Sequence, residues 1–263
     1  MDFEQGVTIG GYRFDPIVLS ILFILIVAAI FAALPQLDIW ATWLFHDPEY
    51  GFPVARLPIF RALRQLNNVV ITVTMATLFA SIVLKLALPD QPSLIRPQIS
   101  TFLITTLVVG NVLIVNWLLK GYSGRPRPVH VDQFGGELPF VRAGDFSGEC
   151  VRNCSFVSGE GSSAFWIFAI WMVAPPHIRR VTFVPAVVYV VAISLNRIAF
   201  GAHFLSDVLL SWGVMALVVA VAHRFLIANP PDWLSDERQE ARLARAGRAI
   251  RAAIGLAPGA ARS

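Results

Sequence analysis

A histidine and an aspartate stand four residues apart in the last quarter of the sequence, at His203 and Asp207. On one face of a helix, side chains at this spacing lie within hydrogen-bonding reach. A carboxylate on one imidazole nitrogen fixes the tautomer and leaves the other nitrogen free to attack an electrophile. Such a pair is more often structural than catalytic. Asp207, however, falls a turn inside an apolar segment, where a carboxylate without a role is rare.

Basic residues stand at two places where an apolar run ends. Lys120 and Arg127 follow one run, and Arg197 lies near the end of another. A lysine presents a point charge and an arginine a planar fork to phosphate oxygens, and the proline at 128 limits the freedom of the loop. The pattern is compatible with a phosphate site but by itself is weak evidence for one. The alternative is ordinary snorkelling of basic side chains to lipid headgroups, which flank most membrane helices.

A third polar cluster opens the apolar run that begins near residue 159, where Ser158, Gly159 and Glu160 lie among further serines and glycines. Small residues at a helix N-terminus expose backbone N–H groups that bind anions. The alternative is a small-residue face that packs closely on a neighbouring helix. Glu160 argues against that alternative, because a carboxylate near the membrane is costly unless it has a partner or a role.

Metal chemistry and a disulfide scaffold both find little support in the sequence. No dense group of carboxylates or histidines indicates a metal site, and we predict no cofactor. The two cysteines, Cys150 and Cys154, are too few for a scaffold and lack the pattern of a zinc site. They could form one local bridge if their loop faces an oxidising compartment.

The elements that must position these residues are membrane helices. Apolar residues make up 56% of the chain and charged residues only 14%, whereas a soluble domain carries about 25%. We therefore predict an all-α polytopic fold, with a transmembrane domain over residues 1–234 and a basic amphipathic tail over 235–263. That tail could bind anionic lipid or lie solvated. The six predicted crossings are 16–34, 69–88, 102–119, 159–174, 181–199 and 204–228.

Lysine and arginine residues are distributed unequally between the two predicted sides. Twelve of the 21 lie on the side that holds both termini. Of the other nine, three are the candidates Lys120, Arg127 and Arg197. The positive-inside rule then places both termini in the cytoplasm and the loop 120–157 outside. All three polar clusters fall at helix ends on that outer side, so we expect them to converge on one pocket.

The three clusters together resemble the signature of the type 2 phosphatidic acid phosphatase superfamily. Its first motif, a lysine, six residues and Arg-Pro, is matched by Lys120, Arg127 and Pro128. Its third, Ser-Arg, five residues, His, three residues, Asp, is matched by Arg197, His203 and Asp207. Asn196 takes the place of the serine. The second motif, Pro-Ser-Gly-His, departs at two positions, where Val157 and Glu160 flank Ser158 and Gly159.

The resemblance implies a mechanism and a role for each residue. His203 would attack phosphorus to give a phosphohistidine, and Asp207 would orient and stabilise its imidazole. The phosphate would be bound by Lys120, Arg127, Arg197, Ser158 and the N–H of Gly159. Glu160 replaces the histidine that normally protonates the leaving oxygen. Either Glu160 or His130 supplies that proton, or the leaving group needs little help, or Glu160 instead pairs with the arginines.

The substrate that follows is a lipid phosphate monoester or pyrophosphate at headgroup level. The Val-Ser-Gly-Glu variant is similar to that of bacterial lipid A 4′-phosphatases, which implies lipid A 4′-phosphate and a bacterial inner membrane with a periplasmic site. A phosphotransferase with the same site and a transporter are the alternatives. Transport predicts polar residues at mid-depth in several helices, whereas here they gather at one boundary. The predicted partners are the bilayer and its lipid, with no nucleic acid and no obligate protein partner.

Overall fold

The computed structural model describes residues 7–9 and 12–255 and is predominantly helical. The chain forms two compact units. The first comprises Met1–Asn68 and Thr106–Val221, and the second Val69–Thr105 and Ala222–Ser263. All the candidate site residues fall in the first unit. A short antiparallel hairpin of β1 (Val7–Ile9) and β2 (Tyr12–Phe14) precedes the helices.

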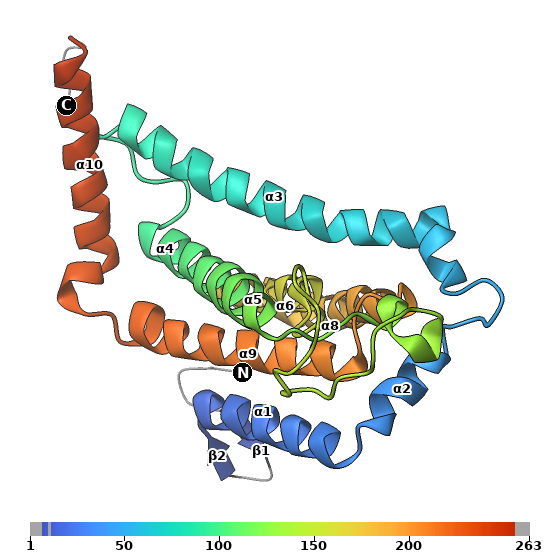
Figure 1. Ribbon diagram of the computed structural model, residues 1–263. Coiled ribbons are helices and arrows are strands. Elements are labelled where there is room, and N and C mark those ends of the chain that lie inside the picture. The colour runs from blue at the N-terminus through green and yellow to red at the C-terminus, as the bar shows by residue number, and fades with distance from the viewer. Residues whose placement is uncertain (1–6, 10–11, 256–263) are drawn as a thin grey trace. The chain divides into compact units, whose positions relative to one another are not determined.

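Most of the α-helices are labelled in Figure 1. Several begin at a proline, whose fixed φ suits the first helical turn. The N-terminal half contains α1 (Pro16–Ala33), α2 (Gln36–Trp43), α3 (Pro58–Ala87), α4 (Pro97–Thr106), a π-helical segment (Leu107–Leu119) and α5 (Lys120–Tyr122). The C-terminal half contains α6 (Gly159–Phe165), α7 (Ile167–Val173), α8 (Pro176–Ala199), α9 (Leu205–His223), a π-helical turn (Arg224–Ala228) and α10 (Asp236–Ala253). Three-residue 3-10 turns lie at Pro128–His130, Asp132–Phe134 and Asp232–Leu234, and a four-residue one at Pro53–Arg56.

Five helical stretches within the described residues are long and apolar enough to cross a membrane. They are Pro16–Ala33, Pro58–Ala87, Pro97–Tyr122, Pro176–Ala199 and Leu205–Ala228. They correspond to five of the six crossings predicted from the sequence, and the all-α polytopic class is confirmed.

The predicted fourth crossing, 159–174, differs from the other five. It is divided at Trp166 into α6 and α7, each of 7 residues. At 1.5 Å per residue the pair extends over only about 22 Å, short of the roughly 30 Å of hydrocarbon. The buried Trp166 indole donates to Thr106 at 2.9 Å where the helix is interrupted. Its role as a full crossing stays a prediction.

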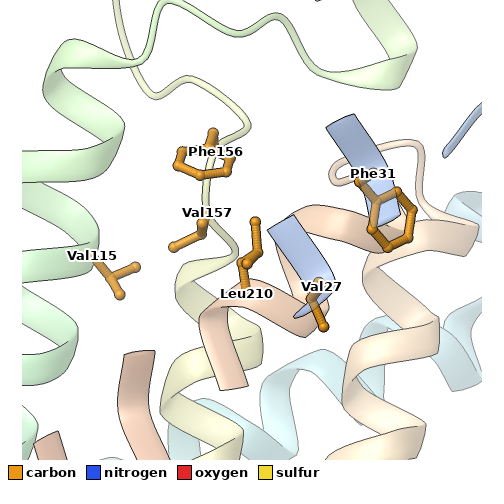
Figure 2. Close-up of a cluster of buried hydrophobic side chains, with 6 residues drawn as sticks. All are labelled: Val27, Phe31, Val115, Phe156, Val157 and Leu210. Atoms are coloured by element: carbon orange, nitrogen blue, oxygen red, sulfur yellow. The ribbon is translucent and has the colours of Figure 1, made fainter. Parts of the chain in front are cut away.

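A cluster of buried apolar side chains lies in the first unit next to the polar loop that opens α6. It draws on α1, the π-helical segment, residues 156–157 and α9, as Figure 2 shows. Its members are Val27, Phe31, Val115, Phe156, Val157 and Leu210. Because Val157 directly precedes Ser158, this packing fixes the backbone from which α6 begins.

The turn from α8 to α9 positions the candidate nucleophile. Gly201 has a φ of +62°, and a Cβ at this position would lie 2.5 Å from the Phe52 ring. The N–H of Ala202 returns to the carbonyl of Arg197 at 3.1 Å. Only glycine fits this close, left-handed turn without strain, so the turn holds Arg197 and His203 near each other.

In the second unit, α10 contacts the ends of α3 and α4. Lys85 and Glu240 form an ion pair at 2.6 Å, and Arg248 pairs with Asp90 at 3.0 Å. Gly247 lies so close to the Leu86 carbonyl that a Cβ would approach it to 2.5 Å. Residues Asp236–Ala253 of the predicted tail are thus helical. Its separation as a domain over 235–263 stays a prediction.

Candidate active site

The three polar clusters of the sequence meet at one place in the first unit. Lys120 ends the long helix Pro97–Tyr122, Ser158 caps α6, and Arg197 lies in the last turn of α8. The Ser158 N–H donates to the Asp207 carbonyl at 3.0 Å. A Cβ on Gly159 would lie 3.2 Å from the Lys120 Nζ. Residues from motifs far apart in the chain therefore lie together, and Lys120, Ser158 and Arg197 are all buried.

His203 is fully buried, and its two ring nitrogens have different surroundings. Nδ1 lies 2.8 Å from the Ser155 carbonyl, and because a carbonyl only accepts, Nδ1 carries the proton. Nε2 has no hydrogen-bond partner within the described residues. Burial first, and then the charges of Lys120, Arg197 and Arg127, hold the pKa of His203 well below its ordinary value. The imidazole is therefore neutral, with a free lone pair on Nε2.

Asp207 does not bind His203 directly, contrary to the helical spacing argument. Its Oδ2 lies 3.9 Å from the His203 Nδ1. The reason is that α9 begins only at Leu205, so His203 stands outside the first turn. Oδ2 instead accepts the Phe204 N–H at 2.9 Å and the Ser155 hydroxyl. Ser155 thus contacts both members of the pair, with its carbonyl on one and its hydroxyl on the other.

Glu160 bridges two arginines. Its Oε1 accepts from the Arg64 Nε and its Oε2 pairs with the Arg197 Nε, both at 2.7 Å. The Arg197 side chain is 3% exposed and that of Arg64 52%, so the bridge runs from the buried site to its rim. The Nη1 of Arg197 has no hydrogen-bond partner within the described residues. That nitrogen remains available to an anion.

Arg127 is held by the loop that contains the cysteines. Its Nε and Nη2 donate to the carbonyl and the side-chain oxygen of Asn153, at 3.0 and 2.6 Å. Asn153 has a φ of +52° and lies inside the ring that the Cys150–Cys154 disulfide closes. The disulfide loop therefore sets the position of one phosphate-binding candidate.

Several residues of the site escaped the sequence analysis. Arg64 and Arg125 were counted among the ordinary cations of the outer side, and Asp38, Asn153 and Ser155 were not singled out. Asp38 and Arg64 contact partners 87 or more residues away, so no local spacing reveals them. The only signal for Asp38 is a carboxylate directly after the first apolar run.

The remaining expectations concern His130 and metals. The His130 side chain is exposed, and its backbone pairs with Leu138. Within the part of the chain that the structure describes, no three His, Cys, Asp or Glu side chains are grouped so as to hold a metal ion. That no metal takes part stays a prediction.

Comparison with known proteins identifies the family. The family model for the PAP2 superfamily matches residues 98–230, just over half of the chain. The chain belongs to the PAP2 superfamily. The match contains all three motifs and excludes both Asp38 and Arg64. As a PAP2 protein with five helices long enough to span a bilayer, the chain is a polytopic membrane protein.

Three relatives of this PAP2 protein are named lipid A 4′-phosphatase. That of Rhizobium leguminosarum is 47% identical over 117 residues, 44% of this chain and 50% of the relative. That of Rhizobium etli is 48% identical over 116 residues, covering 44% and 45%. That of Francisella tularensis subsp. novicida is 39% identical over 126 residues, covering 44% and 57%. The chain thus spans about half the length of these curated relatives. It matches no solved structure.

Proposed function

We propose that the chain is a membrane phosphatase that hydrolyses a lipid phosphate monoester, with lipid A 4′-phosphate as the preferred substrate. The observation that carries the proposal is the buried Nε2 of His203, which has no hydrogen-bond partner within the described residues and lies near the cations Lys120, Arg127 and Arg197. Family membership and the names of the three relatives support the same reaction. The lipid would enter laterally from the bilayer.

In the first step, the Nε2 lone pair of His203 attacks phosphorus and the bond to the lipid oxygen breaks. The bonding electrons leave with that oxygen, which takes up a proton from water. The imidazole keeps its Nδ1 proton on the Ser155 carbonyl and becomes positively charged. The Asp207 carboxylate, 3.9 Å from Nδ1, offsets this charge through space. In the second step, water attacks the phosphohistidine, phosphate leaves and His203 is again neutral.

The phosphate oxygens would be bound by Lys120, Arg127 and Arg197, together with the Ser158 hydroxyl and the Gly159 N–H. The Ser158 oxygen accepts the Gly161 N–H at 3.0 Å, so its own proton remains to be donated. Preorganised donors of this kind stabilise the charge that develops during phosphoryl transfer.

For Glu160 we propose a positioning role instead of that of a proton donor. Both of its oxygens contact guanidinium groups, which favours the ionised form. An ionised carboxylate has no proton to give. By holding the Nε of Arg197, Glu160 turns the free Nη1 of that arginine toward the phosphate.

The proposed location is a bacterial inner membrane, with the site on the periplasmic side and both termini in the cytoplasm. The support is the excess of lysine and arginine on the side of the termini. A periplasmic site also suits the Cys150–Cys154 disulfide, because that compartment is oxidising.

The test uses purified protein in detergent with lipid A, phosphatidic acid and a polyprenyl pyrophosphate, with and without chelator. We expect release of inorganic phosphate, fastest from lipid A, and none from the His203→Ala variant. Labelled phosphate that appears on a second lipid instead of in solution would indicate a phosphotransferase. Equal phosphate release by His203→Ala would contradict the proposal.

A further inference from the structure

A fully buried arginine, Arg125, lies between two carboxylates, one of which belongs to Asp207 next to the candidate nucleophile. Arg125 donates through Nη2 to Asp38 at 2.8 Å and through Nη1 to Asp207 at 2.5 Å. Its Nε donates to the Val141 carbonyl at 2.8 Å. The Phe204 ring covers the guanidinium at 4.4 Å. All five N–H groups of an arginine need partners when it is buried, and here each of its three nitrogens is engaged.

Asp38 joins this network from α2, outside the residues that the family model matches. Its Oδ1 accepts the Ser206 N–H at 2.8 Å, and its Oδ2 accepts the Ser206 hydroxyl at 2.6 Å besides Arg125. Every contact of its two oxygens is an accepting one, as expected for a carboxylate ion. Burial raises the pKa of Asp38 and the charge of Arg125 opposes that shift. The ion pairs of Arg125 with Asp38 and Asp207 fit a network of one positive and two negative charges.

We propose that Asp38 and Arg125 are positioning residues for the attack by His203. Arg125 fixes the Asp207 carboxylate, and Asp38 shares the charge of Arg125, so that one negative charge remains uncompensated next to the imidazole. That charge stabilises the imidazolium formed as Nε2 bonds to phosphorus. The proposal rests on the proposed function, since it assumes His203 as the nucleophile.

The Arg125 pair with Asp207 would change if Asp38 lost its charge. With Asp38 neutral, the positive charge of Arg125 is balanced by Asp207 alone. No net negative charge then remains next to the imidazole to favour its cationic form. Binding of the phosphate group should change little. The side chain of Asp38 bonds to Arg125 and Ser206, and not to the proposed phosphate ligands Lys120, Arg127 and Arg197. Loss of turnover without loss of phosphate affinity is therefore the expected signature.

The first test is the Asp38→Asn variant, which keeps the side-chain shape. We expect kcat to fall by about 10- to 100-fold, with KM within about twofold of the wild type. In an Asp207→Asn background the same change should cost almost nothing, because residues that act through one another are not additive. The matched control is Asp47→Asn, shortly after α2. The Asp47 carboxylate accepts hydrogen bonds from the backbone N–H groups of Glu49 and Tyr50.

A second measurement does not depend on the substrate. Vanadate can bond to Nε2 as a fifth ligand, whereas sulfate is held only by the cations. We expect Asp38→Asn to weaken vanadate binding by about tenfold or more and to leave sulfate binding unchanged. Wild-type protein that binds vanadate but hydrolyses no lipid phosphate would reject the proposed function alone. Unchanged vanadate binding in Asp38→Asn would overturn the positioning role alone.

Misfolding of Asp38→Asn is checked by elution volume and unfolding temperature. If that variant does not fold, the Ser206→Ala variant is used as the test. The Ser206 hydroxyl accepts from the Arg125 Nη1 at 2.9 Å and donates to Asp38, so alanine removes this link and keeps all three charged side chains. We expect Ser206→Ala to weaken vanadate binding, by less than Asp38→Asn does, and to leave sulfate binding unchanged. Equal effects on vanadate and sulfate, or none, would overturn the proposal.

Discussion

At the scale of single residues, the proposed site separates the groups proposed to bind phosphate from the group proposed to react with it. Lys120, Arg127 and Arg197 supply positive charge, while His203 stays neutral among them. This neutrality follows from burial and from the same cations, which both disfavour an imidazolium. In the proposed function, this arrangement provides a nucleophile at neutral pH with an anion site around it.

The first prediction concerns the nucleophile. His203→Ala should lower kcat by on the order of 10³-fold or more, because no covalent intermediate can form. The measurement is phosphate release from a lipid phosphate under saturating substrate. His130→Ala is the matched control, since that histidine is exposed, and we expect it to keep most of the activity. An inactive His130→Ala with an active His203→Ala would reverse the assignment.

The second prediction concerns Glu160. Glu160→Gln should slow an alkyl or sugar phosphate and an activated aryl phosphate by similar factors, because the change disturbs Arg197 and not a proton transfer. A proton donor would matter far more for the poor leaving group. The two rates are compared with those of Glu149→Gln, an exposed carboxylate in the loop before the disulfide. Selective slowing of the poor leaving group would restore the acid role.

At the scale of elements, helix ends and loops bring the motif residues together. Lys120, Arg127, Arg197 and His203 could be singled out as candidates from spacing, because each motif is local in the chain. The expected His203–Asp207 hydrogen bond is absent, because it required α9 to include His203; the two side chains lie 3.9 Å apart instead. Asp38, Arg64 and Arg125 could not be found this way, since their partnerships depend on which helix ends become neighbours in space.

The third prediction concerns the α8–α9 turn. Gly201→Ala should destabilise the protein by about 1–3 kcal/mol and lower activity, because alanine is strained at a φ of +62° and its Cβ would meet the Phe52 ring. The measurements are the unfolding temperature in detergent and kcat. Gly121→Ala is the control, as nothing lies within 4 Å of its would-be Cβ. Equal behaviour of the two variants would show that the turn tolerates a side chain.

The fourth prediction concerns the loop closed by the Cys150–Cys154 disulfide. This loop contains Asn153, which accepts hydrogen bonds from Arg127, and it is followed directly by Ser155. Replacing Cys150 and Cys154 by serine should raise KM or lower kcat by on the order of tenfold, because the loop is freed where it positions the site. A reductant should impair the wild type to the same extent and leave the double variant unchanged. Full wild-type activity under reduction, with free thiols shown by mass spectrometry, would contradict this role.

At the scale of the whole molecule, the chain joins a family region to segments that the family model does not match. Residues 98–230 carry the three motifs, whereas α2 and the first part of α3 supply Asp38 and Arg64. The composition was sufficient to predict an all-helical membrane protein. The divided α6–α7 segment was not predictable from hydropathy, because the mean apolarity of a segment does not reveal an interruption at one residue.

The last prediction concerns orientation in the membrane. The chain has two cysteines, so a variant with both replaced by serine can carry one new cysteine at a chosen exposed position. Gln133, in the loop after Arg127, and Arg245, on α10, are both exposed. If the site faces the periplasm, a membrane-impermeant maleimide should label Gln133→Cys in intact spheroplasts, because that loop lies outside. Arg245→Cys should react only after the membrane is opened, because the positive-inside rule retains the basic tail in the cytoplasm. Labelling of Arg245→Cys alone in intact spheroplasts would invert the topology, and the proposed phosphatase would then act on lipids of the cytoplasmic leaflet.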